Sequence, residues 1–214
     1  MMMHAPTRRE GCARAILRHE GGAALLIALV LLLAVLIVGV SAARTALDAE
    51  KSARNMRDRL IAFQAAEAAL ADAERDIEGS GGDPARAALF AAGSAIGFED
   101  GCARGANNAN LGLCLRTPPG LAPAWLATDL ASDDSAAVPY GKFTGAAMPV
   151  GSGPLPALAP RYIIELMPLA RAGEDAGDRA ANVYRITSIG FGTRMSTRVV
   201  LQAFYRKVAA GGTA

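Results

Sequence analysis

The feature that most constrains this chain is an apolar run followed by a long stretch without helix breakers. Every residue from Ala23 to Val40 is apolar or glycine, and residues 41–43 extend the run with small side chains. A helix over 23–43 is about 31 Å long at 1.5 Å per residue, which matches the hydrocarbon core of a bilayer. The hydrophobic part of a cleaved secretory signal is shorter, roughly 7–15 residues. Length therefore predicts a retained anchor, although residues 40–42 also resemble a secretory cleavage site.

The segment 44–78 predicts that the helix continues beyond the anchor. It contains neither proline nor glycine and is rich in Ala, Leu, Arg, Glu, Gln and Met, which are strong helix formers. Apolar residues recur at helical spacing, so we expect one helix over 23–78 that ends at the Gly-rich residues 79–82. The predicted packing stripe is Met56, Leu60, Phe63 and Leu70, aligned with Ala49, Ala53, Ala73 and Ile77. Glu67 falls at the edge of this stripe, where solvent exposure is expected.

The remainder divides into a loop-rich region, 79–160, and a strand region, 161–207. Within the first, residues 121–130 predict a brief helix in which Trp125 packs the loops together. Within the second, strands are expected at 161–167, 183–189 and 194–205, because β-branched and aromatic residues cluster there. Residues 190–192 (GFG) predict a turn, and 208–214 a loose tail. The fold class is α+β: a long N-terminal helix packed on a small antiparallel sheet.

Cys102 and Cys114 are expected to form a disulfide if the chain beyond the apolar run is exported, since disulfides persist in oxidising compartments. The alternative is two unrelated buried thiols. The third cysteine, Cys12, precedes the run. The chain has only two histidines, so a zinc site is not expected, and Asp129, Asp133 and Asp134 do not have the spacing of a calcium-binding loop.

Composition and motifs favour a non-enzymatic protein. No nucleophile elbow, P-loop, metal-binding histidine pair or dinucleotide-binding turn occurs, and both histidines precede the apolar run. The net charge is only +2 and aromatic residues make up 5% of the chain, which gives no basis for nucleic-acid binding. We therefore expect no cofactor, no metal and no nucleic-acid partner.

Three segments together resemble the PilX-type minor pilins of type IV pili. They are GAALLIALVLLLAVLIVG at 22–39, RNMRDRLIAFQAAEAALADAE at 54–74 and YRITSIGFGTRMSTRVVLQAFYRK at 184–207. The short basic leader before Gly22 is similar to the class III signal of pilins. The resemblance implies cleavage by prepilin peptidase between Gly22 and Ala23, with Gly21 as the alternative site, and methylation of the product. The leader, 1–22, is then lost and the helix from 23 stays.

The resemblance also implies the location and the partners of the protein. It implies a single-pass inner-membrane protein with a periplasmic C-terminal region that assembles into the pilus. Its implied partners are the major pilin, other minor pilins and prepilin peptidase. Most pilins carry glutamate at the fifth mature position, whereas this chain has Ile27, or Leu26 if the cut follows Gly21. Because it lacks this carboxylate, the chain resembles the minor subunits that lie at the filament tip.

Two other functions stay open from the residues alone. One is a type II secretion pseudopilin, which is a close variant of the same design. The other is a signal-anchored periplasmic binding module that never enters a filament. Only the pilin and pseudopilin require cleavage after glycine with retention of the apolar helix.

Overall fold

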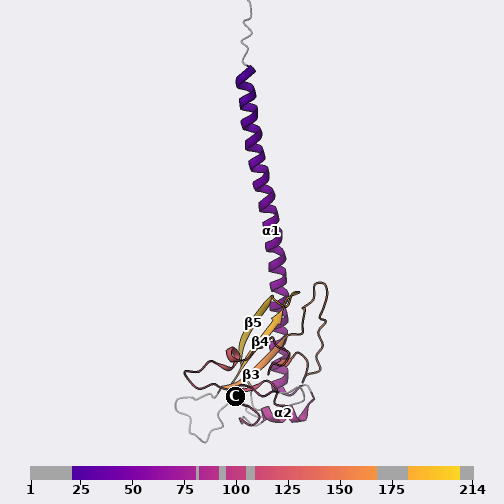
Figure 1. Ribbon diagram of the computed structural model, residues 1–214. Helices are drawn as coiled ribbons and strands as arrows, with labels where there is room; N and C mark the ends of the chain where they lie inside the picture. Colours follow the sequence, from indigo (N-terminus) through magenta and orange to yellow (C-terminus); the bar gives the residue numbers. More distant parts are fainter. Residues whose placement is uncertain (1–20, 81, 92–94, 105–108, 168–182, 208–214) are drawn as a thin grey trace, which may run out of the picture. The chain divides into compact units, whose positions relative to one another are not determined.

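A computed structural model describes residues 21–80, 82–91, 95–104, 109–167 and 183–207 (Figure 1). The chain divides into two compact units, Met1–Lys51 and Ser52–Ala214. The predicted leader, apart from its last residues, and the predicted loose tail lie outside the described residues. The elements in chain order are α1 Gly21–Glu78, α2 Pro84–Ala91, β1 Leu113–Leu115, α3 Ala124–Ala127, β2 Val138–Pro139, β3 Arg161–Met167, β4 Val183–Phe191 and β5 Arg198–Arg206.

Helix α1 spans 58 residues, as the absence of proline and the abundance of helix formers predict. Its end is a glycine C-cap. Gly79 has a φ of +77°, and its N–H donates to the Asp76 carbonyl while the Ser80 N–H donates to the Arg75 carbonyl. This pair of bonds is the Schellman arrangement, for which glycine supplies the left-handed conformation at no steric cost.

The buried face of α1 in the second unit is not the predicted stripe. Met56, Leu60 and Phe63 are 68%, 53% and 39% exposed, and Leu70 alone of the four packs against the core. The prediction is therefore wrong for the first three. The buried residues are mostly small or acidic, at Asp58, Ala62, Ala65, Ala66, Ala69, Asp72, Ala73, Asp76 and Ile77. Alanine allows a sheet to approach the helix axis closely, which large side chains would prevent. Glu67 is exposed, as expected.

Glycine on β4 marks the closest approach between α1 and the sheet. A Cβ at Gly190 would collide with the Ala62 carbonyl oxygen and the Ala66 nitrogen. Two residues earlier, the Ser188 hydroxyl donates to the Ala66 carbonyl at 2.9 Å. Small residues on the helix thus face small residues on the strand, and backbone packs against backbone.

The sheet has five strands in the order β1-β3-β4-β5, with β2 pairing β3. Strands β3, β4 and β5 are antiparallel neighbours, as predicted, and β2 is antiparallel to β3. Strand β1 is parallel to β3, with Leu113 opposite Ile164, so the sheet is mixed rather than purely antiparallel. Strand β1 comes from the region predicted as loops, where its three residues were too few to give a periodic signal.

The turn between β4 and β5 falls later than predicted. Gly190 and Phe191 belong to β4, and the chain turns over residues 192–197 before β5 begins at Arg198. Phe191 is buried in the core, which favours its place in a strand over a turn. The predicted helix around Trp125 is confirmed as the single turn α3, and Trp125 packs, half-buried, on a core cluster under the loops.

Two apolar clusters hold the second unit together. One contains α1 residues, α2, β1 and the side chains of β3 and β4 that include Tyr162, Ile164, Tyr184 and Ile186. The other contains Ile163, Ile189 and Phe191 from the same strands, together with the disulfide and the loops around α3. Because successive side chains of a strand point to opposite faces, β3 and β4 are buried on both sides.

Candidate functional site

The apolar part of α1 in the first unit is exposed throughout. From Leu25 to Val40 every large apolar side chain is exposed, and the helix includes an 18-residue window of mean hydropathy 3.3. By length and composition this helix can cross a membrane. Gly22 and Ala23 lie near its start, both are exposed, and a Cβ added at Gly22 would meet no atom within 4 Å. Ile27 lies in this part of the helix, and its exposed side chain is aliphatic.

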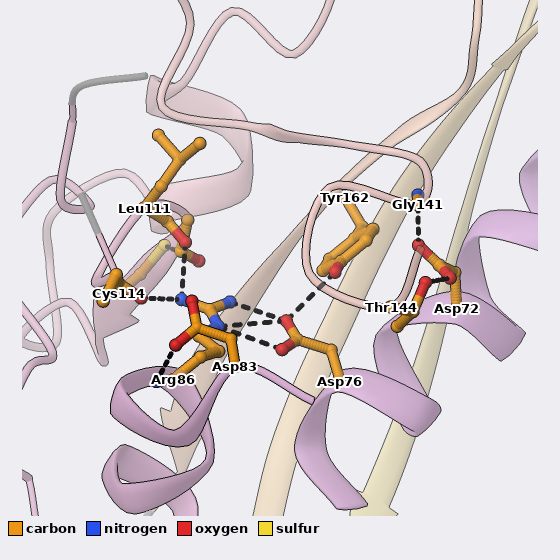
Figure 2. A network of polar contacts seen from close by, with 11 residues as sticks. Asp72, Asp76, Asp83, Arg86, Leu111, Cys114, Gly141, Thr144 and Tyr162 are labelled. Carbon is orange, nitrogen blue, oxygen red and sulfur yellow. Dashed lines mark hydrogen bonds and ion pairs between the residues drawn. The ribbon is translucent and has the colours of Figure 1, made fainter. Parts of the chain in front are cut away.

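The second unit is organised by three buried carboxylates of α1, and Asp76 carries the largest network. The Arg86 guanidinium donates to both Asp76 oxygens, from Nε at 3.0 Å and from Nη2 at 2.7 Å. The Tyr162 hydroxyl donates to Asp76 Oδ2 at 3.0 Å. All three side chains are buried. Figure 2 shows the carboxylate between the guanidinium and the phenol.

Arg86 lies on α2, which begins with an N-cap residue followed by a proline. The Asp83 carboxylate accepts from the N–H groups of Ala85 and Arg86, and Pro84 occupies the first helical position, where its missing N–H costs nothing. The remaining guanidinium nitrogen, Nη1, donates to the carbonyls of Ala109 and Leu111 at 2.7 and 2.9 Å. This arginine therefore joins α1, α2 and the segment that leads into β1.

Aromatic rings enclose the same guanidinium. Its carbon lies 4.1 Å from the centre of the Phe143 ring and 5.2 Å from that of Phe90. Such cation–π contacts are favourable where water is excluded. The charge of Arg86 is thus compensated by a carboxylate, two carbonyls and two ring faces.

Asp72, one helical turn before Asp76, fixes a loop onto α1. Its Oδ2 accepts from the Gly141 N–H at 2.7 Å, and its Oδ1 accepts from the Thr144 hydroxyl. Arg75 on the same helix also donates to it. Figure 2 shows this carboxylate aimed at the loop that follows β2. Gly141 has no room for a Cβ, because Ala146 backbone atoms occupy that space.

Asp58 performs the same task for the β4–β5 turn. It accepts from the N–H and hydroxyl of Thr193, from the hydroxyl of Thr197 and from the Arg194 guanidinium. An open hollow of about 350 Å³ adjoins it. The residues that line this hollow are Arg54, Arg57, Asp58, Ile61, Gly153, Pro154 and Thr193.

The contacts of Asp58, Tyr162 and Tyr205 shift the pKa values of these three side chains. Burial alone would raise the pKa of Asp58, but the hydrogen bonds from Thr197, Thr193 and Arg194 outweigh it and lower the pKa from 3.8 to about 2. Burial and the negative charge of Asp76 raise the pKa of Tyr162 well above its usual value. The hydrogen bond to Glu78 raises the pKa of Tyr205 to about 12.

The arrangement is suited to fixing loops on a helix. Each of the three carboxylates accepts several hydrogen bonds, so its lone pairs are directed at protein donors. Within the described ranges, no group of three or more His, Cys, Asp or Glu side chains is placed to hold a metal. The three aspartates are each joined to a segment far away in sequence.

The predicted disulfide is present. Cys102 and Cys114 are bonded, and both are buried in the second core cluster. Cys114 lies on β1, while Cys102 lies in the turn that pairs with that strand through Glu99. The bridge therefore ties the outer edge of β1 to the chain that covers it.

Sequence reasoning missed the three aspartates and Arg86. The usable signal was the alanine pattern at 62, 65, 66, 69 and 73, because small residues at helical spacing indicate a close packing partner. Asp58, Asp72 and Asp76 fall on that same face. The large apolar residues Met56, Leu60 and Phe63 drew the prediction away from that face, although Leu70, Ala73 and Ile77 of the predicted stripe do pack in the core.

Comparison with family models matches most of the chain. The model described as PilX N-terminal matches residues 21–71, and the model described as Type IV pilus assembly protein PilX C-term matches residues 100–207. The second match alone covers more than half of the chain. The chain belongs to the PilX family. No curated protein and no solved structure matches it.

Membership in the PilX family makes the chain a component of type IV pilus assembly, and that family consists of structural pilus components. The two matched ranges contain Asp58 and the β4–β5 turn that it holds, as well as both bridged cysteines. Residues 72–99 lie between the matched ranges. Asp72, Asp76 and Arg86 therefore stand in the part that neither PilX model covers.

Proposed function

We propose that this PilX-family protein is a minor pilin that primes pilus assembly at or near the filament tip. The observation that carries the proposal is the apolar part of α1, which has no polar side chain from Ala23 to Val40. Such a helix leaves lipid only for an equally apolar setting, and the core of a helical filament provides one. Van der Waals packing between helices drives that exchange where hydrophobicity cannot.

A place at the tip is supported by Ile27. In the pilin pattern the carboxylate at this position pairs with the amino terminus of a neighbouring subunit. An isoleucine side chain accepts no hydrogen bond, so this subunit does not need to dock beneath a preceding one. A repeating major subunit is disfavoured for the same reason.

Maturation follows from the same design. Prepilin peptidase removes residues 1–22, and the mature protein begins at Ala23 in the inner membrane with its C-terminal region in the periplasm. Its partners are then the major pilin and other minor pilins. The protein has no catalytic role in this proposal.

The test combines a deletion strain with analysis of the mature protein. Deleting the gene is expected to leave few or no surface pili, with the major subunit retained in the membrane, and the wild-type gene restores them. Mass spectrometry is expected to find Ala23 at the amino terminus, and Gly22→Glu to leave the unprocessed precursor, because the peptidase site accepts a small residue.

Three results would overturn this proposal in different ways. A normal number of pili in the deletion strain favours the anchored binding module. Loss of type II secretion with unchanged pili favours the pseudopilin. A mature protein that begins near Ala43 indicates ordinary secretory cleavage and excludes a retained helix.

A further inference from the structure

Strand β5 is an edge strand with an open side. It is the last strand in the order β1-β3-β4-β5, and within the described ranges no strand pairs with its outer side (Figure 1). It is nine residues long, which is longer than the typical strand of about 5–6 residues. Long exposed edges are templates for pairing with another chain, and most proteins cover or shorten them.

The opposite edge of the sheet is covered. The backbone of residues 99–103 bonds along β1, with the Leu115 N–H donating to the Glu99 carbonyl and the Ala103 N–H to the Leu113 carbonyl. The Cys102–Cys114 bridge holds this cover in place. The open side of β5 is thus a property of one edge and not of the whole sheet.

The register shows which backbone groups of β5 face outward. The Gly192 N–H donates to the Thr197 carbonyl, and residues of β4 and β5 pair without a break from there to Val183 and Arg206. Bonded and non-bonded pairs alternate in an antiparallel ladder. The odd-numbered residues of β5 are therefore directed at β4, and the N–H and C=O groups of its even-numbered residues point away from the sheet.

Neither face of β5 is sealed, in contrast to β3 and β4. The even-numbered side chains are all exposed, including Val200 at 48% and Phe204 at 67%. The odd-numbered side chains, which lie on the helix side, are only half-buried. A further strand beside β5 would cover apolar surface on both faces as well as satisfy the outward backbone groups.

The charges at the two ends of β5 determine which kind of strand can pair with its open side. Arg198 and Arg206 are exposed and flank Val200 and Phe204 on the same face. If two copies paired antiparallel with Val200 opposite Phe204, Arg198 of each would stand opposite Arg206 of the other. Like charges directly opposite one another destabilise a pair of strands. The two arginines therefore oppose self-pairing and favour a strand with carboxylates at both ends.

We propose that β5 is a docking edge for an extended segment of a different polypeptide chain, which adds to the sheet by backbone pairing. In this mode backbone hydrogen bonds supply affinity, and alternate side chains supply specificity. The segment has acidic residues eight positions apart, facing Arg198 and Arg206, and apolar residues at the third and seventh of those nine positions. This proposal does not depend on a tip location or on leader cleavage.

The test uses the full-length chain in detergent micelles and a fluorescent nine-residue peptide, Asp-Thr-Val-Thr-Thr-Thr-Val-Thr-Asp, with blocked ends. Fluorescence anisotropy is expected to show saturable binding of this peptide. The same peptide with lysine at both ends is expected to bind about tenfold more weakly or worse, a difference of about 1.4 kcal/mol. In the double variant Arg198→Glu and Arg206→Glu the preference of the two peptides is expected to reverse.

A backbone variant separates strand addition from simple charge attraction. Val200→Pro removes one outward N–H and breaks no bond to β4, a position at which edge strands tolerate proline. It is expected to abolish binding, whereas Val200→Thr, which keeps the N–H and the branched side chain, is expected to bind like the wild type. Circular dichroism melts show whether each variant is folded.

Three results would overturn the docking proposal: no binding of the acidic peptide, equal binding of both peptides, or wild-type binding by folded Val200→Pro. Peptide binding is measured on purified protein and requires no filament. Normal piliation in a deletion strain would therefore refute the proposed function and leave this inference intact.

Discussion

The carboxylate of Asp76 at the end of α1 and the guanidinium of Arg86 on α2 form a two-point ion pair in which both side chains are buried. Ten residues separate them in sequence, and the glycine C-cap of α1 lies between. Removing one partner from a buried pair leaves the other charge without compensation, which costs more than the pair itself contributes. The pair thus fixes the direction in which the chain leaves the long helix.

Replacing one member of this pair is expected to be strongly destabilising. Asp76→Ala or Arg86→Ala should lower the free energy of unfolding by about 3–5 kcal/mol, measured by urea denaturation of the detergent-solubilised chain. The double variant Asp76→Leu and Arg86→Met is expected to be more stable than either single variant, because no buried charge is then left alone. Single variants within 1 kcal/mol of wild type would contradict a dry, buried pair.

Gly190→Ala is expected to disrupt the packing of β4 on α1. The added Cβ meets backbone atoms of Ala62 and Ala66, which cannot rotate away. The cost should reach about 1–3 kcal/mol or more, as overpacking does in other cores, and thermal unfolding measures it. Since the clash is with backbone, adding Ala62→Gly should not restore stability. Restoration by that second change would show that the strand is held less closely than the structure indicates.

The lowered pKa of Asp58 predicts a stabilisation that acid removes. An aspartate whose folded pKa is about 2, below its ordinary value of 3.8, contributes stability above pH 4 that is lost as the pH falls towards 2. Melting temperatures of wild type and Asp58→Asn should therefore differ at pH 6 and converge near pH 2. The same gap at both pH values would show that the charge of Asp58 is not what the β4–β5 turn requires.

The two faces of α1 predict different responses to substitution. Leu60→Ser and Phe63→Ser should change the unfolding free energy by about 0.5 kcal/mol or slightly more, as surface substitutions do. Ile77→Ala, on the buried face, should cost about 2–5 kcal/mol. Chemical denaturation of the three variants decides between the two faces. A large loss at Leu60 or Phe63 would show that these two side chains are buried, as the original stripe predicted.

The disulfide and the leader together predict a thiol count. The precursor contains three cysteines, of which Cys102 and Cys114 are bridged, so only Cys12 should react with a thiol reagent before reduction. After cleavage at Gly22 the mature protein should show no reactive thiol, and two after reduction, read by mass spectrometry. Replacing both bridged cysteines with serine should cost roughly 2–3 kcal/mol by the loop-closure model. Labelling of unreduced Cys102 would contradict the bridge.

Local sequence determined the long helix, its end at Gly79 and the three long strands. These features depend on helix propensity, on the glycine cap and on runs of β-branched residues, all of which act over a few neighbouring positions. The pairing of Cys102 with Cys114 was also accessible, since an exported segment with two cysteines leaves one possible bridge. The resemblance to PilX proteins likewise came from the sequence.

Only the tertiary structure decided which face of α1 is buried. Large apolar residues at 56, 60 and 63 give the stronger periodic signal, but a helix face made of alanine and aspartate lets β4 approach to backbone contact at Gly190, and the loops supply the donors that buried carboxylates need. Donors at residues 141, 162 and 193 are far from the aspartates in sequence, and Arg86 reaches Asp76 from the next helix. Hydrophobic periodicity counts apolar side chains along one segment, and it cannot register hydrogen-bond partners that only the fold brings together.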